Sequence, residues 1–399
     1  MSAALPRVVL APGRDRPARG RHPWVFSGAI ARVEGAPTDG AEVEVVAADG
    51  SFVARGLFNA QSQIRVRLYG WDAAERIDEA FFATRLDRAL ALRHALGLMA
   101  PDGGCRLVFS EGDGLSGLVV DRYRDVLSVQ LTSLALAHRR ELLLDLLDER
   151  LRPSGTLLRT EKGVLEEEGL EARDGVLRGA APDEPMPVVE SGLTFLVDLR
   201  TGQKTGYFLD QRDNRRAVAA LAAGRRVADV FCYSGGFTLP MLRAGAASVV
   251  GVDGSAPAVE LAGANVRANG LDDGRASFVV GDAFKWLQGQ AEAGERYDLI
   301  VLDPPRFARS TRGVPGALRG YRGLNELAVR CLVPGGILVT CSCTGRVSRE
   351  QFEGVLAEVE AISGRRIRVL ESRGQAADHP VSPTCPETAY LKCLICAVE

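Results

Sequence analysis

The chain has 399 residues, of which 46% are hydrophobic and 25% are charged. This composition excludes a mainly disordered, collagen-like or coiled-coil protein and suggests two or three globular domains. The formal net charge of -2 argues against a uniformly basic nucleic-acid binder, yet only four of the 49 basic residues are lysines. The arginine excess reflects either codon bias or the use of guanidinium groups on phosphates and bases, and composition leaves both open.

No stretch approaches the ~18 consecutive apolar residues of a membrane helix, and the Arg-rich residues 1–21 precede no apolar stretch of a secretory signal. We therefore expect a cytoplasmic protein. The eight cysteines show no disulfide framework. Cys393 and Cys396 form a lone C-x-x-C that lacks the further ligands of a zinc site, so we expect no metal.

Residues 1–75 predict a small β-domain. Alternating or β-branched residues mark strands at Val43–Ala47, Phe52–Arg55 and Gln63–Leu68, and Asp49-Gly50 marks a hairpin turn. Arginines and aromatic residues in this segment indicate an RNA-binding module, but an ordinary barrel with a solvated basic face and a buried tryptophan explains them equally well. The candidate RNA-binding residues here are Arg14, Arg19, His22, Trp24, Arg65 and Arg67.

Residues 76–190 predict a mixed, connecting domain. Apolar residues at helical spacing predict a helix over Asp78–Leu96 and a second over Arg139–Arg150. Strands are expected at Leu107–Phe109, Gly117–Asp121 and Asp125–Leu131. The acidic run formed by Glu161 and Glu166–Glu168 is expected to be a solvated turn.

Residues 191–399 alternate apolar strand signals with helical stretches, which predicts an α/β domain with a doubly wound parallel sheet. The expected strands are Arg226–Val230, Ser248–Val252, Ala276–Val280, Leu299–Leu302 and Ile337–Cys341, and the clearest intervening helices are Leu239–Ala244 and Ala256–Asn269. In such sheets a ligand lies beyond the carboxyl ends of the strands. The residues that directly follow each strand therefore carry the functional signal.

The first strand ends in a glycine-rich turn that does not follow the G-x-G-x-x-G pattern of dinucleotide enzymes. The next three strands are each followed by an acid, Asp253, Asp282 and Asp303. One such acid is often a turn former or a helix cap, but several in register suit the ribose and adenine of S-adenosylmethionine. The candidate cofactor-binding residues are Phe231, Cys232, Tyr233, Ser234, Gly235, Gly236, Asp253, Asp282 and Asp303.

Together with these residues, several longer motifs resemble a class I S-adenosylmethionine-dependent methyltransferase of the RlmI-type ribosomal RNA large-subunit cytosine-5 methyltransferase family. The motifs, spread over almost the whole chain, are residues 22–28, 111–117, Lys204–Arg212, Ser342-Cys343, 378–382 and 390–392. The resemblance implies a PUA domain over 1–75, a middle α+β domain over 76–190 and a Rossmann-like methyltransferase domain over 191–399. It further implies 23S ribosomal RNA as the substrate and a homodimer.

Methylation of cytosine C5 needs a nucleophile that first adds to C6, and a thiolate facing the base can do this. The resemblance indicates Cys343 as the nucleophile, with Asp303 contacting the cytosine. It places Gln211 near the cofactor or the RNA, but a structural strap explains the segment Lys204–Arg212 equally well. Cys341 is expected to be a packing residue. The base that removes the C5 proton remains unassigned.

The loop after Asp303 is rich in arginine and free of acids up to residue 322, which is typical of a surface that holds phosphates and stacks bases. Its candidates are Arg306, Arg309, Arg312, Arg319, Tyr321 and Arg322. Because a base in a helix must be flipped out at a cost, we expect naked ribosomal RNA as the substrate. Two alternatives remain: an RNA methyltransferase that acts on a purine ring nitrogen or exocyclic amine, and a non-catalytic ribosome assembly factor.

Overall fold

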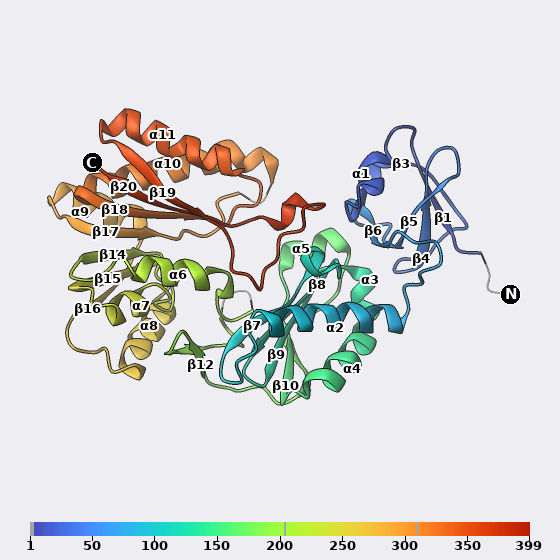
Figure 1. Cartoon of the computed structure of the whole chain (residues 1–399), viewed down its shortest axis with the longest axis horizontal. Coiled ribbons are helices and arrows are strands. Elements are labelled where there is room, and N and C mark those ends of the chain that lie inside the picture. The colour runs from blue at the N-terminus through green and yellow to red at the C-terminus, as the bar shows by residue number, and fades with distance from the viewer. Residues whose placement is uncertain (1–3, 203–204, 309) are drawn as a thin grey trace. The chain divides into compact units, whose positions relative to one another are not determined.

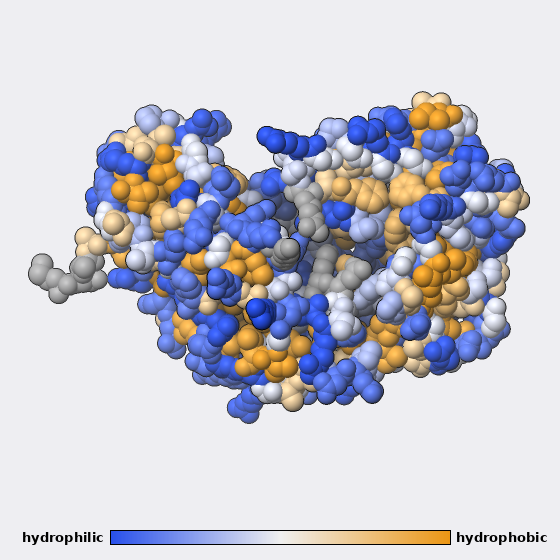
Figure 2. Space-filling model, turned by 180° about the vertical axis from the view of Figure 1, so that it is seen from behind, coloured by the Kyte–Doolittle hydropathy of each residue, from blue (hydrophilic) through white to orange (hydrophobic). Residues whose placement is uncertain are grey.

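A computed structural model describes residues 4–202, 205–308 and 310–399 (Figure 1). Lys204 and Arg309 lie outside the described residues. The chain forms two compact units, the first made of Met1–Val188, Val197–Tyr207 and Ala377–Thr388, and the second made of Val189–Leu196, Phe208–Ala376 and Ala389–Glu399. In the described part of the chain, no helix is both long and apolar enough to cross a membrane. The face drawn in Figure 2 intersperses hydrophilic residues with smaller apolar patches.

The first unit begins with a six-stranded sheet in the order β2-β6-β5-β4-β1-β3. Its elements are β1 (Arg7–Leu10), α1 (Arg16–Arg19), β2 (Trp24–Phe26), η1 (Ser27–Ala29), β3 (Ile30–Glu34), β4 (Glu42–Val46), β5 (Phe52–Phe58) and β6 (Ile64–Gly70). Its core contains the fully buried Val8, Val43, Val45 and Val66. The three strands that alternation predicted here are confirmed.

A five-stranded sheet in the order β11-β10-β9-β8-β7 follows in the same unit. Its strands are β7 (Gly104–Phe109), β8 (Leu118–Tyr123), β9 (Val126–Leu131), β10 (Gly155–Leu158) and β11 (Gly175–Gly179), and its helices are α2 (Glu79–Ala95), η2 (Ser110–Asp113), α3 (Leu134–Ala137), α4 (Arg140–Leu151) and α5 (Lys162–Glu168). The helix expected over 78–96 is confirmed: Asp78 caps α2 by accepting a hydrogen bond from the Phe81 amide, and Phe82 and Leu86 are fully buried.

The expectation of a solvated turn at the acidic run is correct for the exposure of Glu161, Glu166 and Glu167, but wrong for the turn and for Glu168. This segment is helix α5, and the side chain of Glu168 is buried. Its carboxylate accepts hydrogen bonds from Arg67 at 3.0 Å, Ser62 at 2.8 Å and Asn59 at 3.1 Å. A buried carboxylate requires such partners, and these partners lie about a hundred residues earlier in the chain, out of reach of a local sequence pattern.

The second unit contains a seven-stranded sheet in the order β16-β15-β14-β17-β18-β20-β19. Its strands are β14 (Arg226–Val230), β15 (Ser248–Asp253), β16 (Ala276–Val280), β17 (Tyr297–Leu302), β18 (Leu332–Ser342), β19 (Ile367–Arg373) and β20 (Lys392–Val398). Strands β14 to β18 pair in parallel, as predicted. β20 runs antiparallel to both β18 and β19, which the sequence pattern did not predict.

Helices cover both faces of this sheet, with α6, α7 and α8 on one face and α9, α10 and α11 on the other (Figure 1). The helices and turns are η3 (Leu209–Gln211), α6 (Arg212–Ala219), α7 (Thr238–Arg243), α8 (Ala256–Ala268), α9 (Ala283–Glu292), η4 (Thr311–Gly313), α10 (Val314–Cys331) and α11 (Arg349–Ser363). The remaining elements are the paired strands β12 (Met186–Glu190) and β13 (Leu193–Val197) and the turn η5 (Pro386–Thr388). The α/β fold class is confirmed, and its parallel strands bring their carboxyl ends to one edge.

Candidate active site

The turn after β14 combines backbone strain with close packing. Phe231 and Tyr233 have φ angles of 67° and 48°, a left-handed conformation that costs a non-glycine residue roughly 1–3 kcal/mol. Gly235 has a φ of 81°, and a Cβ there would lie 2.9 Å from Leu239 Cδ1. Asn265 of α8 fixes the turn by donating a hydrogen bond to the carbonyl oxygen of Ser234 at 2.9 Å. Strained backbone of this kind clusters at ligand sites.

Asp253, the last residue of β15, ties the neighbouring strand end to this turn. Its Oδ2 accepts a hydrogen bond from the Tyr233 amide at 2.9 Å, and its Oδ1 accepts one from the Ser255 amide at 2.9 Å. Each carboxylate oxygen has a second lone pair and can accept a further hydrogen bond from a hydroxyl group. Asp253 therefore shapes the turn and retains the capacity to bind a ribose.

The next two acids also lie directly after their strands. Asp282 caps α9, since its Oδ1 accepts a hydrogen bond from the Lys285 amide at 2.9 Å. Asp303 follows β17, and its amide donates to the carbonyl oxygen of Val230 at 3.2 Å, beside the strained turn. The structure thus brings the strand-end candidates from β14, β15, β16 and β17 to one edge of the sheet.

Asp229 is a buried acid in β14 that the sequence analysis did not single out. Thr238 donates a hydrogen bond to its Oδ2 at 2.6 Å, and burial raises the pKa of Asp229 to about 7. The Asp229 side chain thereby fixes the first residue of α7, just beyond the turn. Its only sequence signal is an acid inside an otherwise apolar strand.

Cys343 follows β18 and is half-buried, whereas the other seven cysteines are buried. Its Sγ lies 3.9 Å from the carbonyl oxygen of Pro304, in the loop that carries Asp303. A hydrogen bond with Cys393 and burial hold the pKa of the Cys341 thiol well above its ordinary value, so Cys341 stays protonated. Of the two cysteines considered from the sequence, Cys343 is the one accessible to a substrate.

Comparison with known proteins shows which families the chain matches. Residues 174–393 match the S-adenosylmethionine-dependent methyltransferase family, and residues 8–71 match the PUA-like domain family. The ribosomal RNA large subunit methyltransferase I of Aeromonas salmonicida is 42% identical over 388 residues, which cover 97% of this chain and 98% of that protein. The chain belongs to the ribosomal RNA large subunit methyltransferase I family.

Further relatives support this family membership. The ribosomal RNA large subunit methyltransferase I of an Escherichia coli O139:H28 strain is 40% identical and covers 98% of this chain and 99% of that protein. A solved methyltransferase structure complexed with SAH has a TM-score of 0.86 at 20% identity, over 98% of this chain and 99% of that one. A SAM-dependent methyltransferase structure from Streptococcus mutans has a TM-score of 0.85 at 19% identity, with the same coverage. These two structures confirm the fold.

The strand-end site of this family member suits S-adenosylmethionine, the cofactor of its family. A Cβ on Gly254 would approach nothing closer than the Gly281 carbonyl oxygen at 3.9 Å, so space remains open at the ends of β15 and β16. Asp253 and Asp282 offer acceptors for a nucleoside, and the turn at Ser234–Gly236 offers backbone groups. When bound there, the cofactor supplies an activated methyl group. Of the other assignments, Phe231 and Tyr233 are the strained residues of the same turn, and the buried Cys232 lies between them.

Gln211 is buried in turn η3, where its Oε1 accepts a hydrogen bond from Asn214 at 2.6 Å. Its side chain also lies beside the Cys341 thiol at the end of β18. This places Gln211 close to the strand that leads to Cys343. A cofactor contact by Gln211 stays a prediction.

A buried hydroxyl network fixes the residues on both sides of Cys343. Tyr321 is fully buried, and its hydroxyl group lies 2.9 Å from Ser342 Oγ and 2.8 Å from Thr344 Oγ1. Thr344 Oγ1 also accepts a hydrogen bond from the Phe307 amide at 3.2 Å. The expectation that Tyr321 stacks on RNA is therefore wrong, because its ring packs in the core. Tyr321 instead positions the loop that carries Cys343.

Lys392 holds the same loop from the other side. Its buried ammonium group donates hydrogen bonds to the carbonyl oxygens of Thr344 at 2.8 Å, Val347 at 2.8 Å and Tyr390 at 2.9 Å. Burial lowers the pKa of Lys392 to about 8, and the nearby Cys343 sulfur acts in the opposite direction. The sequence analysis included Lys392 only in a resembling motif, because a lone lysine in an apolar strand carries no local signal of this role.

The four arginines among the RNA-binding candidates of the first unit differ in their exposure to solvent. Arg14 is exposed, and Arg65 is half-buried. Arg19 is exposed too, and pairs with Asp15 at 2.6 Å. Arg67 is buried between Glu111 at 3.2 Å and Glu168 at 3.0 Å, so the expectation that it contacts RNA is wrong.

The two aromatic candidates of this unit are both half-buried and engaged. Trp24 donates a hydrogen bond from Nε1 to Glu111 at 2.9 Å, and His22 Nε2 lies 3.3 Å from Glu387. In the second unit, Arg306, Arg312 and Arg319 are exposed around the start of α10. RNA binding by these residues stays a prediction.

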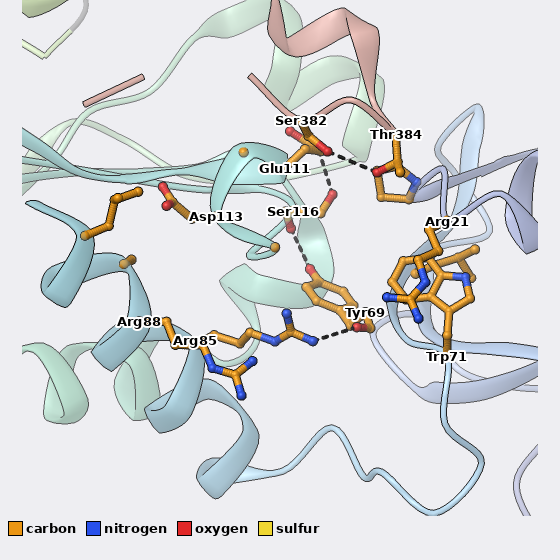
Figure 3. A pocket seen from close by; sticks show the side chains of 16 residues that line it. Arg21, Tyr69, Trp71, Arg85, Arg88, Glu111, Asp113, Ser116, Ser382 and Thr384 are labelled. Atoms are coloured by element: carbon orange, nitrogen blue, oxygen red, sulfur yellow. Dashed lines mark hydrogen bonds between the residues drawn. The ribbon is translucent and has the colours of Figure 1, made fainter. Parts of the chain in front are cut away.

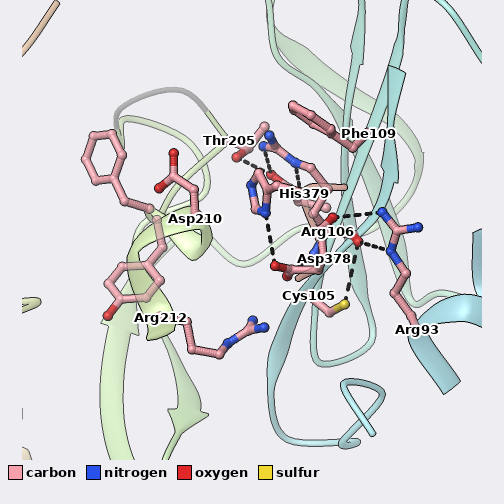
Figure 4. Close-up of polar contacts among 12 residues, drawn as sticks. Arg93, Cys105, Arg106, Phe109, Thr205, Asp210, Arg212, Asp378 and His379 are labelled. Atoms are coloured by element: carbon pink, nitrogen blue, oxygen red, sulfur yellow. Dashed lines mark hydrogen bonds and ion pairs between the residues drawn. The ribbon is translucent and has the colours of Figure 1, made fainter. Parts of the chain in front are cut away.

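The motif that begins at Asp378 has a structural role in the first unit (Figure 4). The Asp378 Oδ2 atom accepts a hydrogen bond from the Arg106 amide at 3.0 Å, and the Asp378 carbonyl oxygen accepts one from Arg93 at 2.7 Å. His379 Nδ1 lies 3.0 Å from Asp378 Oδ1, and Arg93 also pairs with Asp113 through two hydrogen bonds. Buried charges need such partners, and here they anchor the motif to the five-stranded sheet region.

Proposed function

We propose that this protein transfers a methyl group from S-adenosylmethionine to C5 of a cytosine in 23S ribosomal RNA, through a covalent bond between Cys343 Sγ and C6. The observation that carries the proposal is the placement of Cys343. It is the least buried of the eight cysteines and lies against Pro304, in the loop that follows Asp303 at the cofactor edge of the sheet. The names of the relatives support a large-subunit ribosomal RNA substrate. The cytoplasm is the expected location.

The chemistry follows from the weak nucleophilicity of cytosine C5. The Cys343 thiolate adds to C6, which makes C5 electron-rich enough to attack the activated methyl group and leave the cofactor as its thioether. A base, either water or a neighbouring carboxylate, then removes the C5 proton. The C6–S bond breaks in the same step, which restores the aromatic ring and the thiolate. No net oxidation or reduction occurs.

Two neighbouring groups support the addition step. The Lys392 ammonium group lies close enough to Cys343 for each to affect the charge of the other, and a positive charge favours the thiolate. Asp303, next to Pro304, is the candidate for a hydrogen bond to the ring nitrogen or amino group of the cytosine, which would promote electron flow toward C5. Both groups belong to the second unit, together with the cofactor residues.

A trapping experiment tests the covalent step. In RNA that contains 5-fluorocytosine, fluorine replaces the C5 proton, so elimination fails and the enzyme stays attached. The wild-type protein should form a denaturant-resistant complex, and Cys343→Ala should form none while binding S-adenosylmethionine normally by calorimetry. Cys341→Ala is the matched control two residues earlier and should still be trapped. A trapped Cys343→Ala protein would contradict the proposal.

Nucleoside analysis decides between this reaction and its alternatives. Bisulfite mapping of ribosomal RNA from cells with and without the protein should show one protected cytosine that depends on the protein. A methylated purine found by mass spectrometry would instead support the alternative that needs no thiol. Absence of S-adenosylmethionine binding would support a non-catalytic assembly factor.

We propose naked ribosomal RNA as the substrate, because a base must leave its helix to reach Cys343 and an assembled subunit resists that movement. Free 23S ribosomal RNA from cells that lack the protein should be methylated at least tenfold faster than intact large subunits. Equal rates would contradict this part of the proposal.

A further inference from the structure

The first unit contains a cavity of about 390 Å³ that the proposed reaction does not use (Figure 3). Its walls come from three stretches: the end of the six-stranded sheet with Arg21 and Trp71, helix α2 with Arg85 and Arg88, and the motif over residues 111–117. Ser382 and Thr384 complete the lining. The volume falls within the range of about 300–1,000 Å³ typical of small-ligand sites.

The cavity carries an excess of positive charge. Burial lowers the pKa of Arg85, and the like charges of Arg88 and Arg21 add to that effect, while Glu75 opposes it. Arg85 is thus close enough to Arg21 and Arg88 for their like charges to repel it. An anion placed between them would relieve this repulsion.

The two acids in the cavity wall do not neutralise these arginines, because both have other cationic partners. Glu111 pairs with Arg67 at 3.2 Å and accepts hydrogen bonds from Trp24 and Ser116. Asp113 pairs with Arg93 through two hydrogen bonds of 2.5 and 2.8 Å. Glu75 acts on Arg85 more strongly than Arg88 or Arg21 does and offsets one of the three positive charges, so the cavity keeps a smaller positive excess.

The same cavity offers an aromatic surface and hydroxyl groups. Trp71 is half-buried, its orientation fixed by a hydrogen bond from Nε1 to the carbonyl oxygen of Ala18 at 2.7 Å. The Arg21 guanidinium lies 6.0 Å from the centre of the Trp71 ring. In Figure 3 these two side chains line one side of the cavity, opposite Arg85 and Arg88. Arginines around an aromatic ring are the elements that bind unpaired nucleotides.

The glycines of the 111–117 motif keep the cavity wall in shape. Gly114 has a φ of 69°, and a Cβ there would lie 3.1 Å from Arg85 Nη1. A Cβ on Gly112 would lie 2.4 Å from the carbonyl oxygen of Pro380. Side chains at these two positions would displace Arg85 or the segment with Ser382 and Thr384. Gly112 and Gly114 thus contribute to the shape of the cavity wall.

We propose that this cavity binds one unpaired nucleotide of the RNA substrate, with a phosphate held by Arg21, Arg85 and Arg88 and a base against Trp71. The proposal rests on the proposed function for the identity of the RNA. The cavity lies entirely within the first unit, whereas the cofactor residues and Cys343 belong to the second. Its loss should therefore weaken RNA binding and leave cofactor binding unchanged.

The experiment measures binding of a fluorescent twelve-residue oligouridylate to the full chain at several salt concentrations. In the Arg21→Gln/Arg85→Gln/Arg88→Gln variant the Kd should rise at least tenfold, and the slope of log Kd against log salt should fall by about 0.7, since the variant loses one single-strand phosphate contact. Trp71→Ala should weaken binding at least fivefold with little change in the slope, and Trp71→Phe should restore much of the affinity.

The matched control removes three exposed arginines elsewhere in the first unit, Arg32, Arg140 and Arg173, and should bind like the wild type. Far-UV circular dichroism and thermal unfolding verify that the first unit of each variant is folded, and calorimetry with S-adenosylmethionine verifies that the second unit is intact. An unchanged Kd and slope in the triple cavity variant would overturn the proposal. So would tighter binding of free adenosine monophosphate than of the oligouridylate, since the cavity would then be a mononucleotide site.

Methylation assays separate this proposal from the proposed function. If the wild type methylates ribosomal RNA and the cavity variant shows an unchanged KM for RNA, the cavity proposal fails alone. If the wild type methylates no RNA, the proposed function fails, and the oligouridylate measurements still decide the cavity. The expected result is a KM at least tenfold higher with kcat within a factor of two.

Discussion

The ammonium group of Lys392 donates a hydrogen bond to the carbonyl oxygen of Thr344 at 2.8 Å, one residue after Cys343. Lys392 begins β20, the strand that runs antiparallel to β18, so the last strand of the chain fixes the loop that follows its neighbour. Burial lowers the pKa of Lys392 to about 8, which leaves most of it charged at pH 7. Lys392 thus both holds the loop that contains Cys343 and places a positive charge near it.

Replacement of Lys392 should lower the reactivity of the Cys343 thiol more than it lowers the affinity for S-adenosylmethionine. Lys392→Met removes the charge and leaves three carbonyl oxygens without their donor. We expect kcat for methylation to fall at least 50-fold and alkylation of Cys343 by iodoacetamide at pH 7 to slow at least fivefold. The Kd for S-adenosylmethionine should stay within a factor of two. Unchanged alkylation would mean that Lys392 acts only as a structural clamp.

Tyr321→Phe should show separately how the Tyr321 hydroxyl group affects the rate of methylation and the stability of the fold. The substitution keeps the buried ring but removes the hydroxyl group between Ser342 and Thr344, which costs roughly 1–3 kcal/mol when buried partners are left unpaired. We expect kcat to fall five- to 50-fold, with the affinities for RNA and cofactor retained. Stopped-flow methylation and urea unfolding measure the two effects. A loss of RNA affinity with kcat intact would instead show that Tyr321 contacts RNA.

The sequence predicted the parallel strands and the acids that follow them, because both signals are local: an apolar run, then a polar residue. It could not show the burial of Tyr321, since an aromatic residue among arginines resembles an RNA contact until α10 packs on the sheet. Arg67 was misjudged for the same reason, because its partner Glu168 lies 101 residues away. The antiparallel pairing of β20 also went unpredicted, since an apolar terminal run does not specify a direction.

Gly235→Ala tests the turn that the cofactor assignment depends on. The alanine would adopt a φ of 81° and place its Cβ 2.9 Å from Leu239 Cδ1, so the turn between β14 and α7 must move. We expect the Kd for S-adenosylmethionine to rise at least 20-fold by calorimetry. Gly245→Ala is the matched control, because its φ is 90° but its Cβ would meet nothing within 4 Å. It should lose about 1 kcal/mol of stability and bind the cofactor normally. Equal cofactor affinities in the two variants would contradict the assignment of this turn.

Asp229 should make stability depend on pH in the weakly acidic range. Its pKa is raised by burial from 3.8 in its ordinary environment to about 7, so the native state holds a proton that the unfolded state has already lost between these values. Stability from this group is fully present below pH ~4 and is lost as the pH rises toward 7, by up to about 4 kcal/mol. Asp229→Asn keeps an acceptor for Thr238 and cannot ionise. Urea unfolding between pH 5 and 7.5 should therefore show the variant gaining stability relative to the wild type as the pH increases. Parallel curves for the two proteins would show that Asp229 is ionised at an ordinary pKa.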